Sequence, residues 1–109
     1  MAKLETIVRD ESFDAVLERI EKGILNGSFS ATLEDSSDFE SGNSRCAVRI
    51  FERYSMIGSN RVSLSVTLFR GSDGIIHLSG ITSGGSQAAF LKINTFGEEA
   101  FLDKLRELL

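Results

Sequence analysis

The sequence predicts an α+β fold, a two-layer sandwich in the order strand, helix, four antiparallel strands, helix, with both helices on one sheet face. Three observations support this prediction. They are an amphipathic helical segment near the N-terminus, a series of segments in which apolar and polar residues alternate, and a final helical segment with an apolar stripe. The chain has 109 residues, of which 41% are hydrophobic and 26% charged, and this suits one globular domain spanning residues 1–109.

The first two expected elements are a short strand and a helix. Residues 3–8 predict the strand. Residues 12–26 predict the helix, which Ser12 would cap and Gly27 would end. One face of this helix is apolar at the spacing of successive helical turns. That face consists of Phe13, Val16, Leu17, Ile20 and Ile24.

Two strands are expected next, separated by a polar turn. Residues 29–34 alternate as a half-buried strand, residues 35–44 predict the turn, and residues 45–56 predict the following strand. In this last strand we expect one face to contact the helices and the other to carry arginines. The expected helix-facing residues are Cys46, Val48 and Ile50, and the arginines are Arg45, Arg49 and Arg53.

A hairpin follows. Residues 61–70 alternate without interruption, Asp73-Gly74 favours a tight turn, and a strand is expected from Ile75 to about Thr82. The apolar residues of the first hairpin strand are expected to face the helices. They are Val62, Leu64, Val66 and Leu68.

The last expected element is a helix. Thr95 and Glu98 have the spacing of a capping box and predict its start. Before it, Gln87–Ile93 could form an edge strand, a helical turn or a lid, because so short an apolar run does not distinguish them. The apolar stripe of the helix consists of Phe101, Leu102, Leu105, Leu108 and Leu109.

Two helices suffice to cover one face of a five-stranded sheet, so we expect the opposite face to be uncovered. With the strand phases given above, that face is basic and rich in hydroxyl groups. It could be simply solvated, could pack against a second copy in a homodimer, or could bind a small anionic ligand. The candidate ligand- or partner-binding residues on it are Arg45, Arg49, Phe51, Arg53, Phe69 and His77.

A second candidate site is the glycine-serine turn after the last strand. Consecutive backbone N–H groups there could bind a phosphate or carboxylate. The spacing matches neither the dinucleotide-binding nor the P-loop pattern, and a turn that reverses the chain onto the helix layer is the simpler interpretation. The residues concerned are Ser83, Gly84, Gly85, Ser86 and Gln87.

The sequence predicts no catalytic residues, no metal site and no cofactor. His77 has no carboxylate and nucleophile at a recognisable spacing, and Cys46 alternates with apolar residues as a buried small side chain does. The acidic residues of 34–40 lack the spacing of a calcium-binding loop.

Charge and composition restrict the partners. Residues 41–92 contain six basic and two acidic residues, a net charge of +4, and the remainder carries -8, which gives -4 in total. An acidic chain without lysine clusters disfavours nucleic acid. A single cysteine favours a reducing compartment, and no apolar run reaches the ~20 residues of a membrane span. We therefore expect a cytoplasmic protein with no membrane partner.

Several blocks of the chain resemble a family of small, uncharacterised bacterial proteins, a domain of unknown function. The blocks are ATLEDSSDF (31–39), RCAVRIFERYS (45–55), NRVSLSVTL (60–68) and SGGSQAAFLKINTFGEEAFLDKL (83–105). The resemblance implies one domain over the whole chain and implies no activity. In topology, the expected fold is similar to the TATA-binding-protein-like and small helix-grip folds.

The sequence thus favours a non-enzymatic module that self-associates or binds a partner through its uncovered sheet face, its edge or the 83–94 loop. The alternative is a binder of a small anionic or apolar ligand, with a pocket between sheet and helices roofed by residues 83–96.

Overall fold

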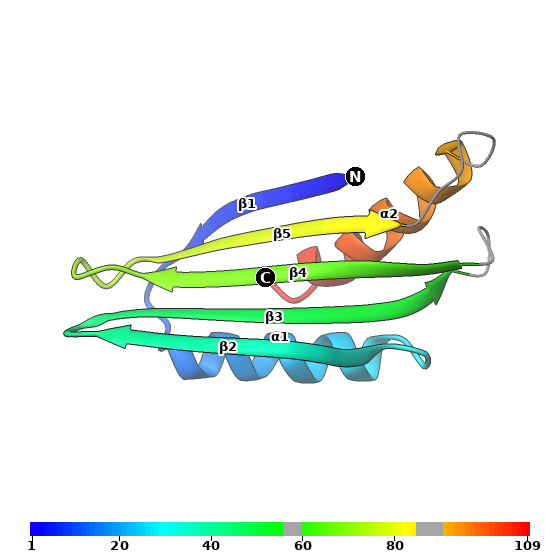
Figure 1. The fold of residues 1–109 in the computed structure, drawn as a ribbon. Coiled ribbons are helices and arrows are strands. Elements are labelled where there is room, and N and C mark those ends of the chain that lie inside the picture. Colours follow the sequence, from blue (N-terminus) through cyan, green and yellow to red (C-terminus); the bar gives the residue numbers. More distant parts are fainter. Residues whose placement is uncertain (56–59, 85–90) are drawn as a thin grey trace.

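The computed structural model describes residues 1–55, 60–84 and 91–109, except for the side chains of 91–96. It confirms the α+β sandwich, with a five-stranded antiparallel sheet in the order β1-β5-β4-β3-β2 (Figure 1). The elements are β1 (Ala2–Val8), α1 (Phe13–Gly27), β2 (Thr32–Ser41), β3 (Ser44–Ser55), β4 (Asn60–Arg70), β5 (Ile76–Gly84) and α2 (Leu91–Arg106).

Helix α1 forms as its sequence predicts. The Ser12 hydroxyl accepts a hydrogen bond from the Ala15 backbone N–H at 3.1 Å, which satisfies one of the unpaired donors at the helix N-terminus. Asp14 lies in the first turn, where the helix dipole favours negative charge. All five residues of the predicted apolar face are buried.

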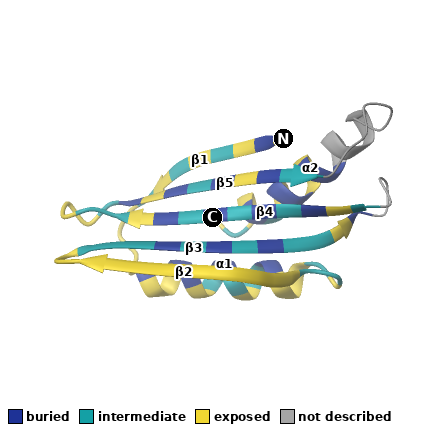
Figure 2. Ribbon diagram, viewed as in Figure 1, coloured by how far each residue is buried: buried dark blue, intermediate teal, exposed yellow. Residues whose placement is uncertain are grey.

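The core lies between the sheet and both helices. The predicted helix-facing residues of β4 are fully buried, and the buried side chains of β5 and α2 pack in the same cluster. Figure 2 shows buried residues alternating with less buried ones along β4 and β5, the pattern of a sheet covered on one face. The members from β5 and α2 are Ile76, Leu78, Phe101, Leu102 and Leu105.

The phase predicted for β3 is wrong. Ala47 and Phe51 are buried, and they pair with Leu68 and Leu64 of β4, whose side chains contact the helices. Because side chains alternate along a strand, the arginines of β3 share this helix-covered face. The uncovered face instead carries Cys46, Val48 and Ile50, all of them partly buried. This phase buries Phe51 in the core and lets Arg45, Arg49 and Arg53 reach their partners on or just after α1.

The predicted polar turn at 35–44 is also wrong, because most of it belongs to β2. The hairpin between β2 and β3 turns at Gly42 and Asn43, and Gly42 adopts a positive φ of 57°, which glycine tolerates best. Every residue of β2 is exposed, so pairing with β3 rather than burial defines this edge strand. Its register is interrupted by a bulge between Leu33 and Asp35.

Helix α2 begins at Leu91, so Thr95 lies inside it and the predicted capping box is wrong. Glu98 is instead buried, where its carboxylate binds the α-ammonium group of Met1 at 2.8 Å and accepts from the Gly84 backbone N–H at 3.0 Å. These contacts join α2 to the ends of β1 and β5. Of the ambiguous segment, Leu91–Ile93 are helical, and the rest lies outside the described residues.

Candidate functional site

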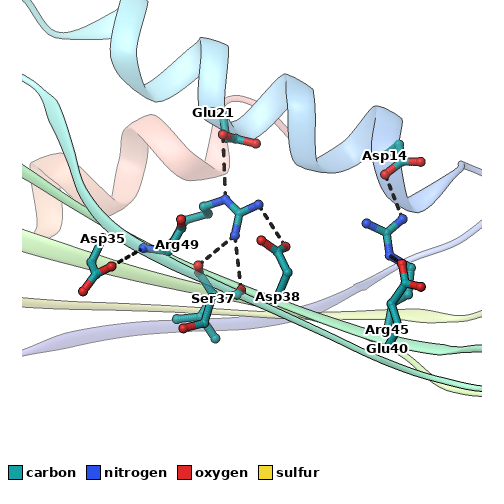
Figure 3. Close-up of polar contacts among 10 residues, drawn as sticks. Asp14, Glu21, Asp35, Ser37, Asp38, Glu40, Arg45 and Arg49 are labelled. Atoms are coloured by element: carbon teal, nitrogen blue, oxygen red, sulfur yellow. Dashed lines mark hydrogen bonds and ion pairs between the residues drawn. The ribbon is translucent and has the colours of Figure 1, made fainter.

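Three arginines on the helix-covered face of β3, Arg45, Arg49 and Arg53, reach helix α1 or the residue that follows it. We call them the arginine ladder. The first, Arg45, forms ion pairs with Asp14 of α1 at 2.7 Å and with Glu40 of β2 at 3.2 Å. Its guanidinium also lies 4.2 Å from the centroid of the Phe13 ring, a cation–π distance. Arg45 therefore closes the sandwich at the start of α1 (Figure 3).

Arg49, the second member, is only 8% exposed. It is paired with Asp38 of β2 at 3.0 Å and with Glu21 of α1 at 3.7 Å. Its guanidinium also donates to the backbone carbonyl of Val48 at 2.9 Å. Figure 3 shows this side chain between the helix and the edge strand, so a buried positive charge is compensated from both sides.

Arg53, the third member, has a neutral partner. Its Nη1 donates to the hydroxyl of Ser28, just after α1, at 2.6 Å, and its guanidinium lies 4.6 Å from the centroid of the Phe101 ring of α2. No carboxylate of the described residues pairs with it, and the stretches 56–59, 85–90 and 91–96 contain no aspartate or glutamate. Burial without an anion lowers the pKa of Arg53 from its ordinary value.

Beside Arg53 lies a cavity of about 530 Å³, which we call the Arg53 pocket. It is formed where the loop after α1, the end of β3 and helix α2 meet. Three serine hydroxyls and the rings of Phe29 and Tyr54 line it together with small residues of α2. The described residues that line it are Ser28, Phe29, Ser30, Arg53, Tyr54, Ser55, Gly97 and Ala100.

The uncovered face of the sheet carries a continuous row of side chains across all five strands, which we call the transverse row. Strand pairing places its members side by side. Phe39 is 63% exposed, Phe69 44% and Ile7 43%, which is high for large apolar side chains. From β2 to β1, the row is Phe39, Cys46, Phe69, His77 and Ile7.

Two shallow hollows lie along this row. One of about 330 Å³ includes Phe39, Cys46 and Phe69, and the other, of about 200 Å³, includes Phe69 and His77. The rings of Phe69 and His77 are tilted against each other with centroids 6.4 Å apart. Phe69 thus divides a surface to which all five strands contribute.

A second row lies two residues away from the transverse row on every strand, toward the start of β4, and it is more polar. It contains Ser37, Val48, Thr67, Ser79 and Glu5, and the row beyond it contains Asp35, Ile50, Ser65, Ile81 and Lys3. In this third row, opposite charges stand at the two edges of the sheet, with two isoleucines between them.

The predicted site residues do not form one site. Phe69 and His77 lie on the uncovered face as expected, whereas the three arginines and Phe51 lie on the helix-covered face. That part of the prediction is wrong, because it rests on the inverted phase of β3. Sequence reasoning also missed Phe39, since it lies in the segment expected to be a turn.

The second predicted site is only partly described. Ser83 and Gly84 end β5, whereas Gly85, Ser86 and Gln87 lie outside the described residues. The Gly84 N–H is bound by the Glu98 carboxylate, and the Ser83 carbonyl accepts from the Ser63 hydroxyl at 3.2 Å. The Gly84 N–H is therefore already occupied and is not available for a bound anion.

The remaining titratable groups form no recognisable catalytic arrangement on the part of the chain that is described. Glu52 pairs with Arg61 at 2.8 Å and lies on a different row from His77. Within 1–55, 60–84 and 91–109, no three histidine, cysteine, aspartate or glutamate side chains are grouped as metal ligands require. Neither described helix combines the length and apolarity needed to cross a bilayer.

Fold and site together define a class, an α+β two-layer sandwich whose helix layer is joined to the sheet by arginines and whose other sheet face is uncovered. The chain belongs to a family of unknown function, DUF6054, whose model matches residues 1–109. The expected membership of a domain-of-unknown-function family over the whole chain is thereby confirmed. No curated protein and no solved structure matches the chain.

Proposed function

We propose that this protein is a self-association module that forms a homodimer through the uncovered face of its sheet, inside the reducing cytoplasm. The transverse row is the observation that carries the proposal. Phe39, Phe69 and Ile7, exposed large apolar residues of the two edge strands and the central strand, are aligned there with Cys46 and His77. Contiguous apolar surface of this kind marks interaction sites more often than solvated faces.

The order of the strands makes this face complementary to itself. β4 is the central strand, so a two-fold axis parallel to it places β1 over β2 and β5 over β3 of the second copy. Each row then lies over the same row of the second copy, with its two ends exchanged. In the transverse row, Ile7 faces Phe39 and Phe69 faces Phe69. An axis across the strands through the middle of the sheet would instead place this row over the row of Tyr54 and Arg61 at the other end of β4.

Charge supports the same axis. In the third row, Lys3 on one edge would face Asp35 on the other edge of the second copy, and Ile81 would face Ile50. Twisted sheets pack face to face at about 30°, so the axis tilts slightly from β4 and long side chains bridge the edges. Five strands of about ten residues present roughly 800 Å² per copy, the size of a standard interface.

The proposal is tested by measuring mass in solution by sedimentation. We expect the wild type to sediment as a dimer and Phe69→Glu as a folded monomer, because a charge in the middle of the transverse row is desolvated in the dimer. Phe29→Glu is the matched control, because Phe29 is fully exposed and lies outside this face. Phe51→Glu is unsuitable, because Phe51 is buried in the core.

A wild type that stays monomeric at millimolar concentration would contradict the proposal. So would a Phe69→Glu variant that remains a dimer, since the interface would then lie elsewhere.

A further inference from the structure

We propose that the Arg53 pocket binds a small organic carboxylate with a compact apolar body. This inference goes beyond self-association, since the pocket is lined by the loop after α1, the end of β3 and helix α2, away from the uncovered face. Neither site depends on the other.

The arginine ladder leaves one of its three members without an anion among the described residues. Arg45 and Arg49 each meet carboxylates from α1 and from β2. Arg53 occupies the next equivalent position on the same strand face, but its partner is the hydroxyl of Ser28. A half-buried guanidinium is costly unless an anion compensates it. The chain supplies that anion at two positions of the ladder and leaves the third for a ligand.

The guanidinium of Arg53 is already positioned by its neighbours. The Phe101 ring packs at 4.6 Å from the guanidinium and the Ser28 hydroxyl accepts from Nη1. Arginine has five N–H donors, so one bond to serine leaves donors for a carboxylate. A guanidinium held on an aromatic face loses little freedom on binding, and its planar shape suits a carboxylate bound through both oxygens.

The size and lining of the Arg53 pocket suit a small monoanion with an apolar body. The volume of about 530 Å³ is within the range of small-molecule sites. Among the described residues of the lining, Arg53 is the only cation, which favours a monoanion over a doubly charged phosphate. The rings of Phe29 and Tyr54 and the methyl of Ala100 offer contact to an apolar body, and the hydroxyls of Ser28 and Ser30 offer further polar contacts.

The test is an NMR titration of the full chain with sodium benzoate. Benzyl alcohol serves as a neutral probe of similar shape, and inorganic phosphate as an anion without an apolar body. We expect benzoate to shift the amide signals of residues 28–30, 53–55 and 97–100. Binding should be at least roughly tenfold tighter than for benzyl alcohol, as for a charge-assisted hydrogen bond. Equal binding of benzoate and benzyl alcohol would overturn the inference, and stronger binding of phosphate would overturn the choice of a carboxylate.

Variants locate the effect. Arg53→Gln should weaken benzoate binding at least roughly tenfold, whereas Arg61→Gln, which removes an exposed arginine of β4, should leave it unchanged. Ala100→Leu keeps the arginine but fills the pocket, and it should also abolish binding. If Arg53→Gln fails to fold, Ala100→Leu decides the question, and unchanged binding there overturns the proposal. Phe69→Glu should bind benzoate normally, so failure of the dimer and failure of the pocket are distinguishable.

Discussion

Arg49 is the residue in this chain whose environment differs most from that of an ordinary surface arginine. Its charge is compensated by Asp38 and Glu21, which come from different elements, and a backbone carbonyl accepts a further hydrogen bond. The two carboxylates are more exposed than the arginine, so they can be hydrated again if it is removed. What a substitution loses is therefore the packing and bonding of the guanidinium itself.

We expect Arg49→Ala to lower the free energy of unfolding by about 2–4 kcal/mol, because it removes a buried, fully paired charge and leaves a cavity. Arg61→Ala is the matched control. Its side chain is 47% exposed and pairs with Glu52, and such a pair contributes about 1 kcal/mol or less. Urea denaturation measures both variants. Similar losses in the two would show that Arg49 acts only as a surface charge.

The pH dependence of stability contains a contribution from Glu11. Hydrogen bonds from Arg19 hold the pKa of the Glu11 carboxyl below its ordinary value of 4.5. A carboxyl whose pKa is lower in the folded state stabilises the protein at pH values above its unfolded-state pKa. This stabilisation is lost as the pH falls through the lowered pKa of the folded state.

Glu11→Gln should therefore be less stable than the wild type at neutral pH, and the difference should shrink below about pH 4.5 and vanish in stronger acid. Urea denaturation of both proteins across this range provides the comparison. A difference that stays constant at every pH would mean that the carboxyl does not titrate with the fold.

At the scale of the elements, helix α2 packs directly against the backbone of β5 at Gly80. A Cβ atom at Gly80 would overlap Cδ2 of Leu105 and lie 3.4 Å from Cδ1 of Leu102. The absent side chain therefore allows the helix to pack against the strand.

Gly80→Ala should destabilise the protein by about 1–3 kcal/mol through overpacking, and Leu105→Ala by about 2–5 kcal/mol through the cavity it leaves. In the double variant the new methyl occupies space that Leu105 vacates. Its loss should be smaller than the sum of the two single losses. Thermal denaturation of the four proteins measures this coupling, and strict additivity would argue against the close approach.

The sequence predicted the order of the elements, the sandwich and the buried face of α1, but not the phase of β3. Both faces of β3 carry apolar residues, so alternation alone does not tell which face the helices cover. The extent of β2 was missed for a different reason. Its polar residues have low strand propensity, and they form a strand because the turn at Gly42 pairs them with β3.

The candidate sites were predictable in part. Phe69 and His77 were assigned to the correct face. Apolar and polar residues alternate without interruption along β4, and β5 pairs with β4 so that His77 lies opposite Phe69. The sequence shows the arginine ladder as a spacing of four residues along β3. That these arginines join the sheet to α1 could not be predicted, because their partners lie far away in sequence, on α1 or just after it. Only the correct phase of β3 brings the two together.

At the scale of the whole molecule, the two sheet faces differ in what covers them. The helix-covered face contains the core and the arginine ladder, whereas the other face presents rows of exposed apolar and hydroxyl side chains. In the basic centre of the chain, Arg45 and Arg49 join the two layers, because both are paired with carboxylates of the acidic flanks.

The proposed dimer predicts a charge-exchange result at its edges. Lys3→Asp should weaken dimerisation about two- to tenfold, since aspartate would face Asp35 of the second copy in an exposed pair. Adding Asp35→Lys should restore the affinity, because the opposite charges are only exchanged. Sedimentation equilibrium at low salt measures both variants. No restoration in the double variant would exclude the axis parallel to β4.

The ladder also limits how α1 can slide. Successive arginines are about 13 Å apart along the strand, whereas their partners, seven residues apart from Asp14 to Glu21 to Ser28, are about 10.5 Å apart along the helix. Apolar packing alone permits a helix to shift by one turn and bury a similar face. Such a shift of about 5.4 Å would separate every arginine from its partner at once. The ladder therefore selects a single lengthwise position for α1, and that position keeps Ser28 beside Arg53 in the pocket.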